Sequence, residues 1–206
     1  MKFKSFGRSI WAVSLCLCWL GAAYPVEAGS NPNPVSATQR PANWAVAISK
    51  PGLNNFFKVS DDLYRGAKPE KQGFVELKSL GVKTVVNLES FHSGLEKIEE
   101  SGSGLAYEHI FMKAWHPEDK EIVRFLKIMA DKTKTPVFVH CYHGSDRTGT
   151  MVAMYRIFIQ NWSKAEALRE LKEGGYGFHT IWKNLEKYIH NLDVAKIRKA
   201  AGLVQP

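Results

Sequence analysis

The 206-residue sequence contains only three cysteines, and this scarcity limits how the chain can be stabilised. Cys16 and Cys18 lie near the start, so Cys141 is the only thiol in the rest of the chain. A framework of disulfides, as small secreted domains use, is therefore excluded for the main body of the protein. A solitary cysteine in such a chain calls for a functional explanation.

Long apolar runs are also missing, apart from one near the N-terminus. The run from Ile10 to Ala23 follows three basic residues and precedes a small-residue cleavage site at Val26-Glu27-Ala28. It is too short to cross a bilayer comfortably. The pattern predicts a secretory signal peptide, residues 1–28, and a periplasmic or secreted protein with no stable membrane insertion after cleavage. A lipid anchor on Cys16 or Cys18 is the alternative, although each follows Leu rather than a small residue.

The chain shows no internal repeat, and its excess of basic residues belongs to no recognisable motif. Removing residues 1–28 leaves 25 basic and 19 acidic residues, a net charge of +6 dispersed over the sequence. This distribution does not indicate nucleic-acid binding. A moderately basic surface does favour a small anionic partner. The remaining residues are enough for one domain with its own core, which we expect to be monomeric.

Composition divides the chain into three parts. After the signal peptide, residues 29–43 are rich in Pro, Ser, Asn and Thr, which predicts a flexible linker. Residues 44–206 form the predicted domain, in which short apolar segments alternate with helical patterns. The expected strands are a hairpin at 56–59 and 63–65, then 82–88, 105–112 and 137–140. This alternation predicts an α/β fold with a mostly parallel sheet between helices.

Six helical patterns accompany these strands. The first begins after Pro69, and others are expected at 91–100, 120–131 and from Arg147 onward. Ser163 and Glu166 form a capping box that opens a further helix. A final core-facing helix is expected to bury Ile181, Leu185, Tyr188 and Ile189.

The most informative stretch joins the strand that ends at His140 to the helix that begins at Arg147. The intervening loop contains Cys141 and Gly144. Such a loop can turn its backbone N–H groups inward and hold an anion at the N-terminus of the helix. Cys141 then lies at the entrance of an anion site and Arg147 at its far edge.

These residue types fit phosphate chemistry. A free thiol is mostly protonated at neutral pH, but inward amides, a helix dipole and a guanidinium all favour the thiolate of Cys141. The planar fork of Arg147 can grip two phosphate oxygens. Transfer of a phosphoryl group to Cys141 and then to water replaces one difficult hydrolysis by two easier steps. This chemistry requires no metal and no cofactor.

The decapeptide His140-Cys141-Tyr142-His143-Gly144-Ser145-Asp146-Arg147-Thr148-Gly149 resembles the HCxxGxxR(S/T)G signature of the protein tyrosine phosphatase superfamily. Its length and flanks resemble the compact dual-specificity branch, most of all its secreted bacterial phytase-like members. The resemblance implies that Cys141 is the nucleophile, that Arg147 binds the phosphate and that the Thr148 hydroxyl helps to release the phosphoenzyme. It also implies a substrate-binding loop formed by His140, Tyr142, His143, Gly144 and Ser145.

A second loop, residues 113–119, resembles the mobile general-acid loop of this superfamily, and Lys113 and His116 are expected to face the substrate. The usual pattern is altered, because His116 separates Trp115 from Pro117. Asp119 is the first candidate for the acid in this loop, Glu118 the second and His116 the third. Alternatively, the two carboxylates only stabilise the start of the following helix.

Asp146 is another candidate for the general acid, because it directly precedes Arg147, as in myotubularin-like phosphatases. Its alternative role is to orient the loop. A general acid must lie within hydrogen-bond reach of the leaving oxygen, which the sequence cannot decide. We rank Asp146 just before Asp119. Arg65 could also reach the ligand, but a structural ion pair is the preferred interpretation.

Three considerations bear on the substrate. The predicted export removes the protein from most cytoplasmic phosphoproteins, and the basic residues expected near the pocket attract polyanions. Two candidate acids suit an alkyl ester, whose leaving group is poor. The first hypothesis is therefore hydrolysis of inositol polyphosphates such as phytate. The alternatives are a protein tyrosine or dual-specificity phosphatase and a phosphoinositide phosphatase, and, outside hydrolysis, a phosphoester-binding pseudophosphatase or a redox-sensing thiol.

Overall fold

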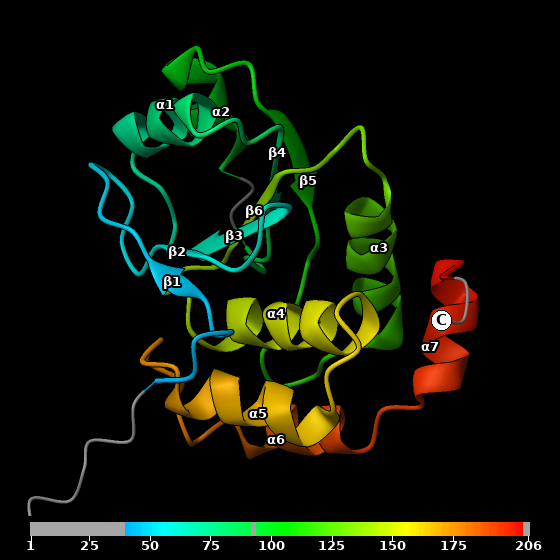
Figure 1. The fold of residues 1–206 in the computed structure, drawn as a ribbon. Helices are drawn as coiled ribbons and strands as arrows, with labels where there is room; N and C mark the ends of the chain where they lie inside the picture. Colours follow the sequence, from blue (N-terminus) through cyan, green and yellow to red (C-terminus); the bar gives the residue numbers. More distant parts are fainter. Residues whose placement is uncertain (1–39, 92–93, 204–206) are drawn as a thin grey trace, which may run out of the picture. The chain divides into compact units, whose positions relative to one another are not determined.

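A six-stranded sheet organises the residues that the computed structural model describes, 40–91 and 94–203 (Figure 1). Its strands are β1 (Val46–Ala47), β2 (Phe57–Lys58), β3 (Leu63–Gly66), β4 (Thr84–Asn87), β5 (Ala106–His109) and β6 (Val137–His140). They lie in the order β1-β2-β3-β6-β4-β5, and the last four in this order run parallel. The predicted α/β class is confirmed, and β6 ends in the middle of the sheet.

Side chains of alternate parity enter two separate cores, one on each face of the sheet. Tyr64, Val85 and Phe138 belong to the core under α1 (Lys71–Ser79) and α2 (Leu95–Ser101). The other face packs against α3 (Asp119–Ala130) and α4 (Asp146–Phe158), and its sheet residues are Leu63, Val86, Val137 and Val139. This period of two is what a strand covered on both faces requires.

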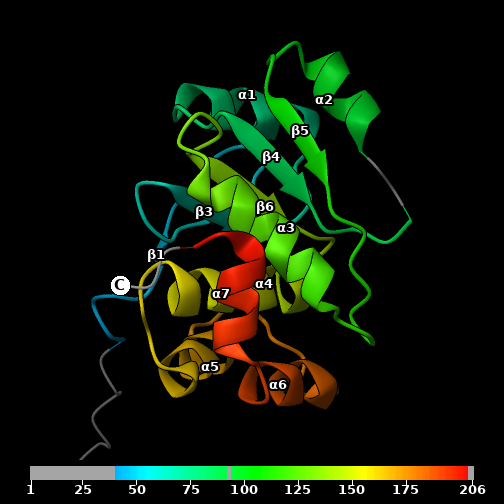
Figure 2. The ribbon, with the colours of Figure 1, turned by 90° about the vertical axis from the view of Figure 1, so that its right-hand side faces the viewer.

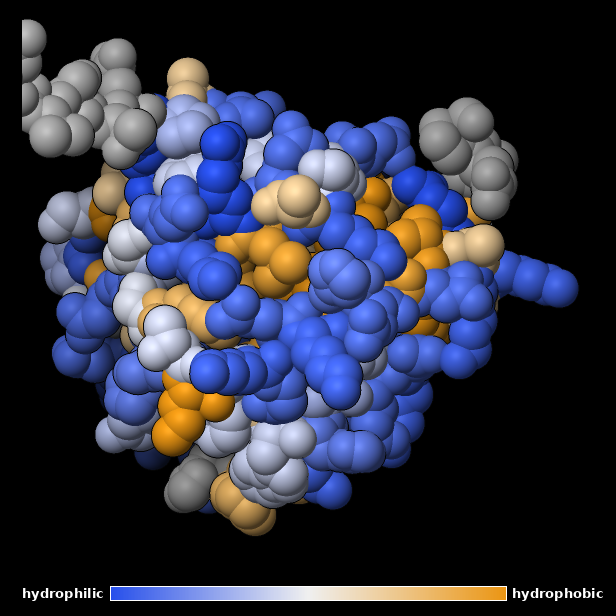
Figure 3. All heavy atoms as spheres, turned by 90° about the horizontal axis from the view of Figure 1, so that it is seen from below, coloured by the Kyte–Doolittle hydropathy of each residue, from blue (hydrophilic) through white to orange (hydrophobic). Residues whose placement is uncertain are grey.

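Helix α4 is enclosed on all sides, since every one of its residues except Arg147 is buried. Its outer side is covered by α5 (Lys164–Glu173) and α6 (Lys183–His190) (Figure 1), and α7 (Val194–Ala201) packs against α3 (Figure 2). Figure 3 views the face formed by α5 and α6 and shows a mainly hydrophilic surface with small apolar areas. In residues 40–91 and 94–203, no helix is long and apolar enough to span a membrane.

Several predicted boundaries differ from the structure. The strand expected at 105–112 ends at His109, and the helix expected at 91–100 begins at Leu95. Ile181 was expected in a final buried helix, but it is 79% exposed and precedes α6. The loop before α6 is fixed by contacts with α4, so the helical period does not extend back to Ile181. That helix is also not the last, because α7 follows it.

The start of the compact unit lies at Arg40 rather than at Trp44. The guanidinium of Arg40 donates hydrogen bonds to the carbonyl of Ala45 (2.6 Å), to the hydroxyl of Tyr176 (2.9 Å) and to the carbonyl of Gly174. These contacts attach residues 40–43 to the domain. The predicted signal peptide and residues 29–39 of the predicted linker lie outside the described residues.

Candidate active site

The loop after β6 is held from outside through its carbonyl groups. The carbonyls of residues 142–144 accept hydrogen bonds from the backbone N–H of Lys68 (3.1 Å), from Nδ2 of Asn55 (3.0 Å) and from Nη2 of Arg65 (2.6 Å), in that order. Among the described residues, no backbone N–H of 142–145 is hydrogen-bonded. Because the carbonyls are engaged from outside, the amides remain available for the anion site that the sequence predicts at the N-terminus of α4.

Gly144 makes this close packing possible. Its φ is +74°, and a Cβ atom there would lie 2.5 Å from the backbone of Gly66 and Ala67. Real Cβ atoms do not approach backbone so closely, so only glycine fits. Residues 141–145, which we call the phosphate-binding loop after its predicted role, therefore rest directly on the carboxyl end of β3.

Cys141 directly follows β6 and is 3% exposed, a free and buried thiol. His140 lies beneath it, with Nδ1 3.2 Å from the carbonyl oxygen of Cys141 and its ring stacked on Phe138. Burial lowers the pKa of His140 to about 3, so its ring is neutral. His140 supports the backbone of the nucleophile; at 3% exposure it does not line the mouth of the pocket, where the predicted substrate-binding residues should lie.

Arg147 is aimed by the segment that follows β4. Its Nη1 donates to the carbonyl of Leu88 (3.2 Å) and lies 3.4 Å from Oγ of Ser90. Thr148 is fully buried, and its hydroxyl has no hydrogen-bond partner among the described residues. Ser90 was not singled out from the sequence, because no local pattern links it to the motif.

Three other side chains of the loop, those of Ser145, Tyr142 and His143, differ in their exposure and contacts. The Ser145 hydroxyl donates to the carbonyl of Tyr176 (2.8 Å), so it ties the loop to the turn after α5 and does not face the substrate. Tyr142 is 59% exposed and meets the exposed His143 edge to face. These two side chains are available at the rim of the pocket.

Asp146 forms a pair that the sequence did not reveal. Its carboxylate accepts hydrogen bonds from the backbone N–H of His179 (2.9 Å) and from the Nδ1 of the same ring (2.9 Å). The ring of His179 lies 5.9 Å from that of His143, which places the pair at the rim of the phosphate-binding loop. His179 has no motif of its own, and the long separation in sequence hid it.

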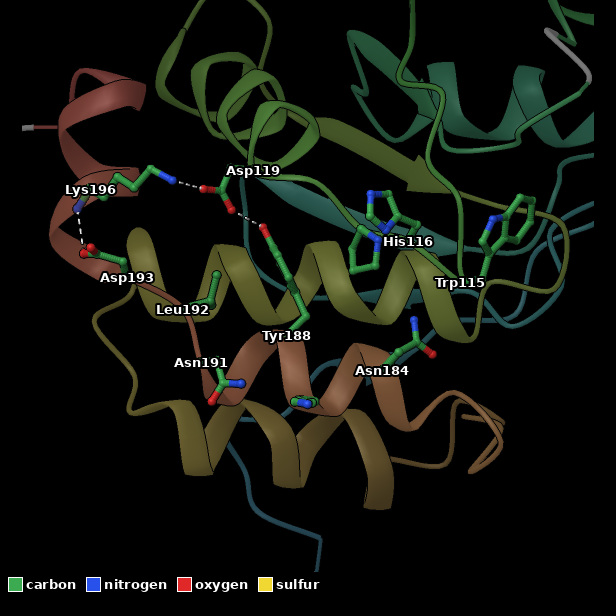
Figure 4. Close-up of a pocket in the computed structure, with 11 residues that line it drawn as sticks. Trp115, His116, Asp119, Asn184, Tyr188, Asn191, Leu192, Asp193 and Lys196 are labelled. Carbon is green, nitrogen blue, oxygen red and sulfur yellow. Dashed lines mark hydrogen bonds and ion pairs between the residues drawn. The ribbon is translucent and has the colours of Figure 1, made fainter.

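Asp119 is engaged elsewhere. It accepts hydrogen bonds from Nζ of Lys196 (2.7 Å) and from the hydroxyl of Tyr188 (2.9 Å), as Figure 4 shows. The bond from Lys196, more than any other contact, holds the pKa of Asp119 below its usual value. Asp119 lines a cavity of about 420 Å³ between the 113–119 loop, α6 and α7, to which no residue of the phosphate-binding loop contributes.

The remaining residues of the 113–119 loop also serve local structure. Glu118 precedes α3 and pairs with Lys120 (2.7 Å), which lowers the pKa of Glu118. Its backbone N–H donates to the carboxylate of Glu121, as at a capped helix start. His116 turns back on Lys113 through a backbone hydrogen bond and lines the same cavity as Asp119. The carboxylates of Glu118 and Asp119 thus lie at the start of α3, and each is paired with a lysine.

An exposed aromatic pair lies next to Ser90 and Met112 in the sequence. Phe91 is 78% exposed and Phe111 45%, and their rings meet edge to face with centroids 6.2 Å apart. Ser90 connects them to the site, because its hydroxyl lies close to Arg147 and donates to the carbonyl of Met112 (2.7 Å). Lys113 lies 5.9 Å from the ring of Phe111. No sequence pattern indicates this pair, since each ring follows a different strand.

The site thus combines a buried thiol at the end of the central strand, an arginine in the first turn of α4 and, between them, a loop that is held through its carbonyls. This arrangement defines the class of cysteine-dependent phosphatases. The fold, with the nucleophile where the parallel strands end, is in keeping with it.

Comparison with known proteins gives the family. A model described as the tyrosine phosphatase family matches residues 52–201. Dual specificity protein phosphatase TpbA of Pseudomonas aeruginosa is 34% identical over 169 residues, which cover 80% of this chain and 73% of the relative. The chain therefore belongs to the tyrosine phosphatase family, in the compact dual-specificity branch of the superfamily.

Two further similarities concern ligands. Inositol diphosphatase DSP5 of Arabidopsis thaliana is 27% identical over 156 residues, which cover 70% of this chain and 72% of the relative. A crystal structure of P. aeruginosa TpbA in complex with phosphotyrosine superposes with a TM-score of 0.69 at 31% identity, covering 79% of this chain and 98% of that one. The two relatives thus bear names that point to different phosphoesters.

Proposed function

We propose that the protein hydrolyses phosphomonoesters through a phosphocysteine intermediate and that phosphotyrosyl peptides are its preferred substrates. The observation that carries the choice of substrate is the exposed Phe91–Phe111 pair, which is linked to Arg147 through Ser90. Aromatic faces of this kind stack on a phenyl ring or a peptide side chain, whereas they gain little from a highly charged inositol polyphosphate. The similarity to TpbA supports the same choice. This ranking reverses the order that the sequence suggested.

In the first step, the thiolate of Cys141 attacks phosphorus and the bond to the leaving oxygen breaks. Arg147 and the inward amides bind the non-bridging oxygens, where charge concentrates in the transition state. In the second step, water attacks phosphorus and the S–P bond breaks. The Thr148 hydroxyl then donates a hydrogen bond to the departing thiolate, which makes sulfur a better leaving group.

For the proton that the leaving oxygen requires, we propose the pair of Asp146 and His179. Asp119 and Glu118 are each paired with a lysine that lowers the carboxyl pKa, and such groups are poor acids near neutral pH. The Asp146–His179 pair is at the rim of the loop, and an imidazole can pass a proton to a substrate while a carboxylate orients it.

Inositol polyphosphates remain the second candidate substrate. Lys113 and the rings of His143 and His179 place cationic or hydrogen-bonding groups at the rim, which suits a polyanion. The likeness to DSP5 favours this alternative.

The test compares phosphate release from a phosphotyrosyl peptide and from inositol hexakisphosphate under identical conditions. We expect the peptide to have the higher kcat/KM, and the double variant Phe91→Ala/Phe111→Ala to lose about fivefold to tenfold on the peptide alone. Val75→Ala, an exposed apolar residue on α1, is the matched control. A higher kcat/KM for the inositol substrate, unaffected by the double variant, would reject the proposed preference. Retained activity of Cys141→Ser would reject the phosphocysteine mechanism itself.

We also propose export, on the strength of the N-terminal sequence alone. N-terminal sequencing of protein recovered from outside the cytoplasm should begin at Gly29 if residues 1–28 are removed.

A further inference from the structure

Arg65 is a buried cation that the mechanism above does not use. It lies in β3, opposite Val139 of β6, one position before the level of His140. Its side chain is fully buried. The phosphate-binding loop packs on the same end of β3, so the guanidinium lies behind the loop and away from solvent.

The contacts of Arg65 are unusual for a buried arginine. Nη2 donates to the carbonyl of Gly144 (2.6 Å), and the guanidinium lies 3.8 Å from the centre of the Tyr176 ring. Nε and Nη1 have no hydrogen-bond partner among the described residues. No carboxylate of the described chain forms an ion pair with Arg65, so the ion pair expected from the sequence is not formed there.

Arg156 shows what a fully satisfied buried arginine looks like in the same protein. Its Nε and Nη2 each bond to a carboxylate oxygen of Glu170 at 2.7 Å, and Nη1 bonds to Gln160 (2.6 Å). Burying a charge without such a partner costs desolvation free energy, so other interactions in the fold must offset that cost. Arg65 has no such carboxylate partner, but Tyr176, Glu170 and Cys141 act on it electrostatically and favour its charged form.

The charge of Arg65 persists at neutral pH. Burial lowers the pKa of Arg65 to about 10, while Tyr176, Glu170 and Cys141 favour its protonated form. Nη2 also lies 3.8 Å from the site that a Cβ on Gly149 would occupy, so the guanidinium sits between the loop and the first turn of α4.

We propose that Arg65 is a positioning residue of the phosphatase reaction. It fixes the Gly144 carbonyl and supplies a permanent positive charge behind the loop. The negative charges of the Cys141 thiolate and of the bound phosphate balance this positive charge. Tyr176 holds the guanidinium in place by stacking. Tyr176 is itself fixed, because its hydroxyl bonds to Glu170 (3.0 Å) and accepts from Arg40 (2.9 Å). A chain of contacts thus runs from the start of the domain to the phosphate-binding loop.

The experiment measures thiolate reactivity directly, so it does not depend on the substrate class proposed above. Iodoacetamide alkylation of Cys141 in the full chain is followed by peptide mass spectrometry as a function of pH, beside kcat and KM for p-nitrophenyl phosphate and thermal unfolding. Both Arg65 variants keep the other charged or titratable groups in or near the loop. These include Arg147, His140, His143, Lys68, Glu89, Glu170, Tyr176, Arg156 and the Asp146–His179 pair.

Two substitutions separate charge from hydrogen bonding. Arg65→Gln keeps a donor for the Gly144 carbonyl but removes the charge, and Arg65→Lys keeps the charge. We expect Arg65→Gln to alkylate about tenfold more slowly near pH 6, with the same limiting rate at high pH, and to lose about tenfold in kcat with little change in KM. Arg65→Lys should restore the alkylation profile. Arg124→Gln, at an exposed arginine of α3, is the matched control.

A folded Arg65→Gln whose alkylation profile and kcat coincide with those of Arg124→Gln overturns the proposal. If Arg65→Gln does not fold, Tyr176→Leu replaces it, since this variant removes the stacking face and leaves the charge unanchored. A shift of two- to fivefold in the same direction supports the proposal, and an unchanged profile and kcat overturn it. Inactivity of every form with intact alkylation would instead point to a failure of the proposed phosphatase function.

Discussion

The phosphate-binding loop and the 113–119 loop lie at the same end of the sheet but are built in different ways. Three consecutive carbonyls of the first loop are tied down by Lys68, Asn55 and Arg65. The second loop is attached at its margins, where Asn184 donates to the carbonyl of Ala114 (2.7 Å) and Asp119 pairs with Lys196 (2.7 Å). The phosphate-binding loop is fixed through its backbone carbonyls, which leaves its amides available for an anion. In the 113–119 loop, by contrast, the carboxylates pair with lysines of neighbouring helices.

The largest effect is expected from a substitution that disturbs the packing of the phosphate-binding loop. Gly144→Ala should lower the free energy of unfolding by about 3 kcal/mol or more and reduce kcat at least about tenfold, because its Cβ would collide with Gly66 and Ala67. Chemical denaturation and steady-state kinetics give the two numbers.

Gly102→Ala is the matched control for that substitution. Gly102 also has a positive φ, +63°, but nothing lies within 4 Å of its would-be Cβ. It should cost only about 1 kcal/mol and leave kcat unchanged. Equal losses for both variants would show that backbone strain, and not contact with β3, determines the behaviour of Gly144.

The two candidate acids extend the comparison to chemistry. Asp146→Asn should lower kcat about 100-fold on an alkyl phosphate in steady-state assays, because the pair with His179 is lost. Asp119→Asn should change kcat less than about threefold and, because the pair with Lys196 is largely exposed, cost no more than about 1 kcal/mol of stability. The reverse pattern would transfer the role of acid to Asp119.

A smaller effect concerns pH and the support beneath the loop. His140 has a pKa of about 3 in the folded protein, because of burial, and about 6.5 when unfolded. Between these values the unfolded chain binds more protons, so stability is lost as the pH falls below about 6.5, by about 2 kcal/mol at pH 5. Urea denaturation at pH 6.5 and at pH 5 should show a smaller loss of unfolding free energy on acidification for His140→Asn than for the parent.

The ionisation of Glu121 also changes the stability in this pH range, and it does so equally in the parent and in His140→Asn. Burial raises the pKa of Glu121 to about 7, so the folded protein binds more protons there and gains stability as the pH falls from about 7 to 4.5. The difference between parent and variant isolates His140. His190→Asn, at an exposed histidine, should follow the parent at every pH, and a parallel shift in this control would discredit the assignment.

Local patterns predicted much of the fold. Alternation and apolar runs placed the hairpin and the central strand, and the capping box predicted at Ser163 is present, with Oγ accepting from the N–H of Glu166 (3.1 Å). Boundaries failed where tertiary contacts end an element, as before α6. The nucleophile, the arginine and the loop glycine were predictable because their chemistry needs contiguous residues between one strand and one helix.

Neighbouring residues are enough to predict an α/β phosphatase loop, since strand, turn and helix dipole act over a short stretch of chain. Which charges serve that loop depends on contacts between distant parts of the fold. Arg65 comes to it from another strand and His179 from a distant turn, while Lys196 draws Asp119 away to α7. Electrostatic partners are chosen by distance in space, and a linear pattern carries no information about that distance until the chain has folded.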